Sequence, residues 1–319
     1  MNKSLRKNQR LLRALILCFL SFSVMLSGCD LQKMSDVGKP SEEKTGEKTE
    51  KKEEESAEPE KTEGPVIVVY YDAQGNRYEM VVDDRVTKHD YDWTKLEHTT
   101  GSPKRVAGYD DGTYTIRQGV DVSHHNGTID WKRAKKAANL EFAFLRLGYR
   151  GYGKEGKLMV DNEFQSSFKR ARAAGLDLGV YFFSQAINEK EAVEEAKLVL
   201  RELNNSKLEL PVVYDPEYIR DDEARTDNVT KEQFTKNTLA FCKEIEKAGY
   251  QPAIYSNLYC EDNMFDLSQL EDYPIWYADY KNEPQTPYRF TYWQYSESGD
   301  VPGIPGKVDL NVEFIRKKK

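Results

Sequence analysis

From residue 118 to the C-terminus, short apolar runs alternate with helical stretches, and this alternation constrains the fold more than any other feature. Apolar runs of about four to eight residues are typical of buried strands, and their alternation with helices is typical of α/β folds. Strands are predicted at residues 119–123, 141–147, 177–183, 210–215, 251–256, 274–278, 290–295 and 307–310. Helices are predicted at residues 130–138, 161–174, 189–203 and 231–248.

Two of these helices carry clear start signals. Asn188 lies three residues before Glu191, and Thr230 lies three residues before Gln233, a spacing typical of a capping box. Helix ends are predicted at two glycines, Gly175 and Gly249. Because full helices are fewer than strands, we expect an irregular (β/α) barrel-like (TIM-like) domain over residues 118–319.

The N-terminus predicts export. Residues 1–29 contain five basic and no acidic residues, and an apolar run over residues 14–26 is too short for a spanning helix. This run ends in Leu-Ser-Gly-Cys, which resembles the bacterial lipobox and implies cleavage after residue 28 and lipid on Cys29. We therefore expect an extracytoplasmic, membrane-anchored protein, in which Cys242 and Cys260 form a disulfide or remain free thiols.

Two further segments precede the barrel. Residues 29–64 are rich in Glu, Lys, Thr, Ser and Pro, so they cannot bury enough apolar surface to fold and predict a disordered charged tether. Residues 65–117 predict a small β-rich extension that opens with two strands around a turn at 72–76. The whole chain has a formal net charge of −7, which argues against nucleic acid as a partner. We expect a monomer.

The strand predicted at residues 210–215 leads into the sequence Tyr-Asp-Pro-Glu, which ends in Asp215 and Glu217. Side chains two residues apart on a strand point to the same face, and reactive residues in barrel enzymes lie at the carboxyl ends of strands. Two neighbouring carboxyl groups push their pKa values apart, which suits an acid and an ionised partner in glycoside hydrolysis. A pair of solvated surface acids is the structural alternative.

A polar loop follows the first barrel strand. Asp121 lies near the end of this strand, and Ser123, His124, His125 and Asn126 follow it. Adjacent histidines rarely reach one metal ion, and the chain has no His-Glu-x-x-His motif or cysteine cluster, so we expect no metal site. The chain also lacks a Gly-x-Ser-x-Gly elbow, which argues against a serine nucleophile.

A third group lies near the C-terminus. Trp293 and Gln294 lie on a predicted strand, and Asp309 lies on the last one. Alternating aromatic residues often fill a barrel interior. An aromatic face and an amide beside carboxylates would also suit a sugar ring and its acetamido group.

Together these segments resemble glycoside hydrolase family 25, the lysozymes of N-acetylmuramidase type. The shared motifs are Asp-Val-Ser-His-His-Asn-Gly, Phe-Leu-Arg-Leu-Gly-Tyr, Gly-Val-Tyr-Phe-Phe-Ser, Tyr-Asp-Pro-Glu, Trp-Tyr-Ala-Asp-Tyr and Tyr-Trp-Gln-Tyr-Ser, then Val-Asp-Leu-Asn. They occur in the family's order over about residues 118–315. One departure is Phe182, because many members carry histidine there, which leaves substrate contacts at this position in doubt.

The resemblance implies hydrolysis of the β-1,4 bond between N-acetylmuramic acid and N-acetylglucosamine in peptidoglycan, without a cofactor. It implies Glu217 as the general acid and Asp215, Asp121 and Asp309 as supporting carboxylates. Asp215 would orient the substrate's acetamido group or stabilise the oxocarbenium-like charge. Substrate contacts are predicted for Tyr181, Tyr255, Trp276, Trp293 and Gln294.

Two other functions remain open on the sequence. A non-catalytic cell-wall glycan-binding lipoprotein could keep the same cleft, although it would not need all four carboxylates. A different surface hydrolase, such as an amidase or a metal-dependent deacetylase, would need chemistry that the sequence does not display.

Overall fold

The computed structural model describes residues 64–72, 75–100, 105–221 and 223–318. The predicted signal peptide, Cys29 and all of the tether except Gly64 lie outside these residues. Within the described residues, no helix is both long and apolar enough to cross a membrane.

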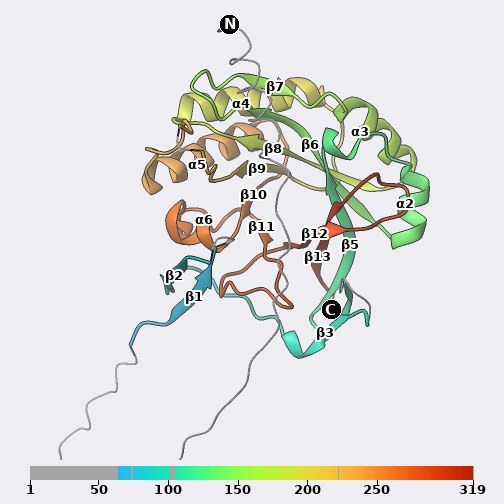
Figure 1. Ribbon diagram of the computed structural model, residues 1–319, viewed down its shortest axis with the longest axis horizontal. Helices are drawn as coiled ribbons and strands as arrows, with labels where there is room; N and C mark the ends of the chain where they lie inside the picture. Colours follow the sequence, from blue (N-terminus) through green and yellow to red (C-terminus); the bar gives the residue numbers. More distant parts are fainter. Residues whose placement is uncertain (1–63, 73–74, 101–104, 222, 319) are drawn as a thin grey trace, which may run out of the picture. The chain divides into compact units, whose positions relative to one another are not determined.

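Eight strands form a closed barrel, as predicted from the alternating pattern (Figure 1). Around the barrel the order is β5, β13, β12, β11, β10, β9, β8 and β6, and β6 pairs with β5 to close the ring. All neighbours are parallel except β13, which is antiparallel to β12 and β5. The bounds are β5 Tyr114–Val122, β6 Phe142–Arg150, β8 Asp177–Ser184, β9 Val212–Pro216, β10 Pro252–Ser256, β11 Ile275–Ala278, β12 Tyr292–Gly299 and β13 Val308–Arg316.

The four predicted helices are present and cover one part of the barrel. They are α2 Trp131–Ala138, α3 Phe164–Ala173, α4 Glu189–Leu203 and α5 Lys231–Lys247. The helices α3, α4 and α5 contact β6, β8, β9 and β10. The unpredicted short elements include β7 (Leu158–Val160), which pairs with the carboxyl-terminal end of β6, and the six-residue α6 (Leu258–Asn263) after β10.

Of the two hydrogen bonds in a capping box, the one accepted by the side chain of the cap residue is confirmed at both predicted helix starts. The Asn188 side chain accepts a hydrogen bond from the Glu191 amide, and Thr230 accepts one from the Gln233 amide. The reciprocal bond of a capping box is absent at Asn188, because the Glu191 carboxylate accepts from the Ile187 amide instead. The predicted helix ends are confirmed by the positive φ angles of two glycines, 76° at Gly175 and 86° at Gly249.

The barrel interior is filled by a cluster of large side chains that is separate from the outer layers. Its buried members are Phe142, Phe144, Leu210, Val213, Ala253, Tyr255, Trp276, Ala278 and Tyr292. A glycine makes room for them: a Cβ atom on Gly179 would lie 2.4 Å from the Phe144 ring, so no other residue fits there without displacement.

The extension contains two strand pairs. Strands β1 (Ile67–Tyr71) and β2 (Arg77–Val81) form the expected antiparallel hairpin, and β3 (Leu96–His98) pairs with β4 (Val106–Tyr109). In Figure 1, the hairpin lies beside α6. Strand β5 begins at Tyr114, five residues earlier than the predicted strand, so the end of the predicted extension already pairs with β13.

Aromatic residues of the extension cover the outer side of β12 and β13. The Tyr91 ring lies 4.4 Å from that of Phe314 on β13, between centroids, and Trp93 stacks on Phe290 at 6.2 Å. Trp93 also contacts Trp293 on β12. This packing covers the outer side of β12 and β13, whereas α3, α4 and α5 cover β6, β8, β9 and β10.

Candidate functional site

The central pair of carboxyl groups, Asp215 and Glu217, lies at the carboxyl end of strand β9. The apolar residues of this strand are fully buried, and Asp215 lies at its carboxyl end with only 3% of its surface exposed. Glu217 follows one residue after the strand and is half-buried. The Asp215 Oδ1 atom makes no hydrogen bond to any residue that the structure describes. A buried acceptor without a donor is costly, so this oxygen is suited to receive a hydrogen bond from a ligand.

The surroundings raise the pKa of both groups. Burial is the main cause for each, because a charged carboxylate is poorly solvated there. The charges of Glu217 and Asp121 raise the pKa of Asp215 further, well above its usual range. Asp121 also raises the pKa of Glu217, which reaches about 7 although the Arg146 guanidinium opposes the shift. Glu217 therefore holds a proton close to neutral pH, as a general acid must.

A second pair of carboxyl groups lies where β5 meets β13. Asp121 and Asp309 are direct cross-strand partners, and their carboxyl groups are hydrogen-bonded to each other. Asp121 also accepts hydrogen bonds from Gln294 Nε2 at 2.8 Å and from Asn311 Nδ2 at 2.7 Å. Burial raises the pKa of Asp121, although these donors and the hydrogen bond with Asp309 oppose the shift. Burial and the Asp121 charge raise the pKa of Asp309 to about 9. The proton of this pair therefore resides on Asp309.

Two tyrosines fix the orientation of the Gln294 amide. The Tyr255 hydroxyl donates to Gln294 Oε1 at 3.2 Å, and the Tyr280 hydroxyl donates to the same oxygen at 2.9 Å. The Gln294 NH₂ group is thereby directed at Asp121. Tyr280 was not predicted, although it is the last residue of the Trp-Tyr-Ala-Asp-Tyr motif. Its side chain is half exposed.

Trp276 and Tyr181 form the floor below the carboxyl groups. Trp276 is 1% exposed, stacks on Phe144 at 4.7 Å and contacts the Tyr181 ring at 5.7 Å. Its indole N–H donates to Asn311 Oδ1 at 2.8 Å, and Asn311 in turn donates to Asp121. Trp276 thus supports the site from beneath, whereas the partly exposed Tyr181 lies nearer to solvent.

Trp293 and Phe182 lie on the outer side of the barrel, away from the carboxyl groups. Neighbouring residues on a strand point to opposite faces, so Trp293 cannot share the face of Gln294. Trp293 is fully buried in the outer layer, where its indole N–H donates to the Asp279 carbonyl at 2.7 Å. The structure gives no geometrical support for its predicted substrate contact. Phe182 is also fully buried in this layer.

Arg146 is a charged residue of the site that the sequence analysis missed. It lies close enough to Asp215 and Glu217 to oppose the rise of both pKa values. Arg146 Nε donates a hydrogen bond to Asp161 Oδ2 at 3.0 Å, and this oxygen lies 2.9 Å from His124 Nδ1. The predicted polar loop thus contributes His124. Among the described residues, no group of three or more His, Cys, Asp or Glu side chains is placed to hold a metal ion.

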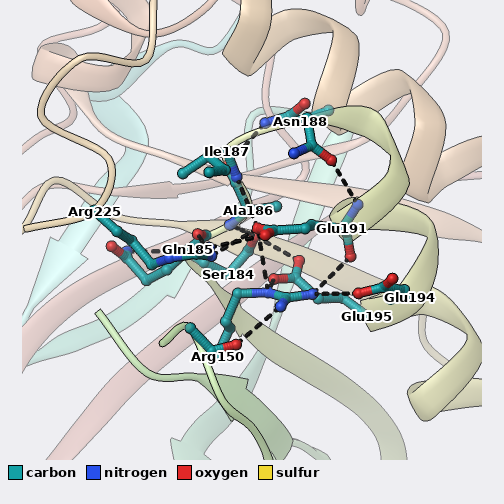
Figure 2. Close-up of polar contacts among 12 residues, drawn as sticks. Arg150, Ser184, Gln185, Ala186, Ile187, Asn188, Glu191, Glu194, Glu195 and Arg225 are labelled. Carbon is teal, nitrogen blue, oxygen red and sulfur yellow. Dashed lines mark hydrogen bonds and ion pairs between the residues drawn. The ribbon is translucent and has the colours of Figure 1, made fainter. Parts of the chain in front are cut away.

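Figure 2 shows a polar network on the outer side of the barrel, in which Arg225 joins Gln185, after the end of β8, to Glu191 of α4. Gln185 Nε2 donates to the Glu217 carbonyl at 2.8 Å. Arg225 donates to the Gln185 carbonyl at 2.7 Å and forms two bonds with the Glu191 carboxylate. Gln185 follows the end of β8, so the network joins the ends of two neighbouring strands and holds the proposed acid in place.

Comparison with known proteins identifies relatives. The model of the family Glycosyl hydrolases family 25 matches residues 120–304. The uncharacterized protein YegX of Escherichia coli O157:H7 is 30% identical over 218 residues, covering 66% of this chain and 73% of YegX. The autolytic lysozyme of Clostridium acetobutylicum is 25% identical over 197 residues, covering 61% of this chain and 55% of the lysozyme.

Among solved structures, the modular autolysin LytC of Streptococcus pneumoniae has a similar fold. The match has a TM-score of 0.56 and 24% sequence identity, and it covers 77% of this chain. The chain spans only 56% of the length of the LytC structure.

Proposed function

The chain belongs to the glycosyl hydrolases of family 25, and from this premise we propose that it cleaves peptidoglycan at the β-1,4 bond between N-acetylmuramic acid and N-acetylglucosamine. The observation that carries the proposal is the pair on β9: Glu217 with a pKa of about 7 beside a buried Asp215 whose Oδ1 has no partner among the described residues. The names of the lysozyme and autolysin relatives support the substrate.

In this reaction Glu217 donates its proton to the glycosidic oxygen as the bond to the anomeric carbon breaks. The substrate's own acetamido oxygen attacks the anomeric carbon, and Asp215 accepts a hydrogen bond from the acetamido N–H through its unpaired oxygen. Glu217, now ionised, removes a proton from the water that opens the cyclic intermediate. The ionised Asp121 stabilises the positive charge that develops on the sugar ring.

The reaction products test the assigned bond. Purified residues 65–319 are incubated with peptidoglycan, the new reducing ends are reduced with borohydride, and the products are identified by mass spectrometry. Reduced muramic acid ends support the proposal, and reduced glucosamine ends contradict it. Binding of the wall without any new reducing end supports the glycan-binding alternative instead.

We also propose that the protein is a lipoprotein held outside the cytoplasm by lipid on Cys29, with the tether at 29–64 between membrane and enzyme and with peptidoglycan as its partner. The basic residues, the short apolar run and the Leu-Ser-Gly-Cys sequence support this. Cys29→Ser should move the protein from the membrane fraction to the soluble fraction of fractionated cells. Unchanged membrane retention would contradict lipidation.

A further inference from the structure

Three tyrosines form a row that starts beside Glu217 and ends on the N-terminal hairpin. Tyr218 directly follows the proposed acid, and its ring lies 5.1 Å from that of Tyr259 on α6, between centroids. Tyr259 in turn meets Tyr78 of β2 edge-on at 5.9 Å. We name these three side chains the tyrosine shelf.

The exposed end of the shelf is not part of the packed interior. Tyr218 is 49% exposed and lies outside both hydrophobic core clusters of the described residues. Tyr259 and Tyr78 are partly buried against the core. An exposed aromatic ring on the residue after the proposed acid offers a flat apolar face to a ligand, and the rings behind it hold that face in position.

The hairpin anchors this region to the loop that carries Glu217. Arg220, three residues after Glu217, forms an ion pair with Asp72 of the hairpin, with 3.4 Å between Nη2 and Oδ2. On the inner face of the hairpin, Tyr70 stacks on Tyr78 at 5.1 Å. Its hydroxyl donates to Asp262 of α6 at 2.9 Å. The extension therefore contacts both α6 and the loop that follows Glu217, in addition to covering the barrel wall.

We propose that the tyrosine shelf binds further sugar units of the glycan strand, beyond those at the cleaved bond. This inference rests on the proposed function. Sugar rings present apolar C–H faces that stack on aromatic rings, and a glycan strand supplies such faces in series. The extension at residues 65–117 thereby makes the enzyme prefer long strands over short oligosaccharides.

The experiment compares kcat/KM on long uncrosslinked glycan strands with kcat/KM on a tetrasaccharide of the same repeat. Tyr218→Leu should lower the ratio of the two values by about fivefold, the size expected for loss of one aromatic contact. Tyr218→Phe should keep the parent ratio, because the ring remains. Tyr78→Leu should shift the ratio in the same direction as Tyr218→Leu.

The matched control is Tyr71→Leu, on the same hairpin but on its outer face, where Tyr71 is 62% exposed. This variant should leave the ratio unchanged. The inference is overturned if Tyr218→Leu keeps the parent ratio, or if Tyr218→Phe loses as much as Tyr218→Leu.

Failure of the proposed function gives a different result, because the parent protein would then cleave neither substrate. The shelf is in that case tested by calorimetric binding of the same long strands to the parent and to Tyr218→Leu. About fivefold weaker binding by Tyr218→Leu supports the shelf, and equal binding contradicts it.

Discussion

The buried ion pair of Arg150 and Glu195 gives a stability prediction that can be worked from its geometry (Figure 2). Arg150 Nε donates to Glu195 Oε1 at 2.6 Å, and the Glu195 side chain has no exposed surface. The other carboxylate oxygen accepts from the Ser184 hydroxyl at 2.6 Å. Ser184 precedes Gln185, so this pair supports the segment that binds the backbone of Glu217.

Arg150→Met would leave Glu195 buried with Ser184 as its remaining hydrogen-bond partner. Breaking one side of a buried ion pair costs about 3–5 kcal/mol of unfolding free energy. In a domain of this size, such a loss lowers the melting temperature by roughly 6–20 °C. In the double variant Arg150→Met/Glu195→Leu no unpaired charge remains. We therefore expect its loss of unfolding free energy to be at least about 2 kcal/mol smaller than the sum of the losses in the two single variants.

The assay is urea unfolding of the parent, both single variants and the double variant at pH 8. This pH is chosen because burial raises the pKa of Glu195 to about 7, so the carboxyl group is ionised there. The control is the exposed pair Lys236–Glu232, also 2.6 Å apart, for which Lys236→Met should cost far less unfolding free energy than Arg150→Met, because solvent screens the exposed charges. A loss below about 1 kcal/mol for Arg150→Met, or additive losses in the double variant, would refute the reasoning.

Three more predictions concern the site, the extension and the thiols. The Arg146 charge lowers the pKa of Glu217, so Arg146→Met should raise this pKa. The kcat/KM of the variant should then fall at a pH above 7, because Glu217 keeps its proton to higher pH. A kcat/KM–pH profile that falls at the same pH as in the parent would contradict this. Trp93→Ala should lower the unfolding free energy by about 3 kcal/mol in urea titrations, because Trp93 covers the barrel wall. A loss under about 1 kcal/mol would contradict this role of Trp93. Cys242 and Cys260 are buried free thiols and should react with a thiol reagent only after unfolding; reaction of the folded protein would contradict their burial.

The eight strands and four helices could be predicted because short apolar runs and helix caps are local signals. The short elements could not, because β7 has three residues and α6 has six, too few for a pattern to repeat. The early start of β5 was missed because Thr115, Arg117 and Gln118 are polar. These residues pair with β13, and Arg117 donates a hydrogen bond to Glu313 there. No local sequence pattern reveals this long-range pairing.

The candidate site shows the same division. The four carboxyl groups stand at strand ends, so their approximate location followed from the sequence. The side of each strand was decided by alternation, which places Gln294 inward and Trp293 outward, and this parity was available in the sequence. Arg146 shares the inward parity of Phe144 on β6 and could have been found in the same way. The hydrogen bond of Tyr280 to Gln294 could not be predicted, because it joins two different segments of the chain.

The role of Glu217 as proton donor is tested most directly by comparing Glu217→Gln with the control Glu297→Gln, an exposed glutamate on β12, on the same peptidoglycan. The measured quantity is the rate at which new muramic acid reducing ends form. We predict that Glu217→Gln releases none above background while its folded state and wall binding persist, and that Glu297→Gln remains close to the parent rate. Release by Glu217→Gln near the parent rate would contradict the assignment of Glu217 as the acid.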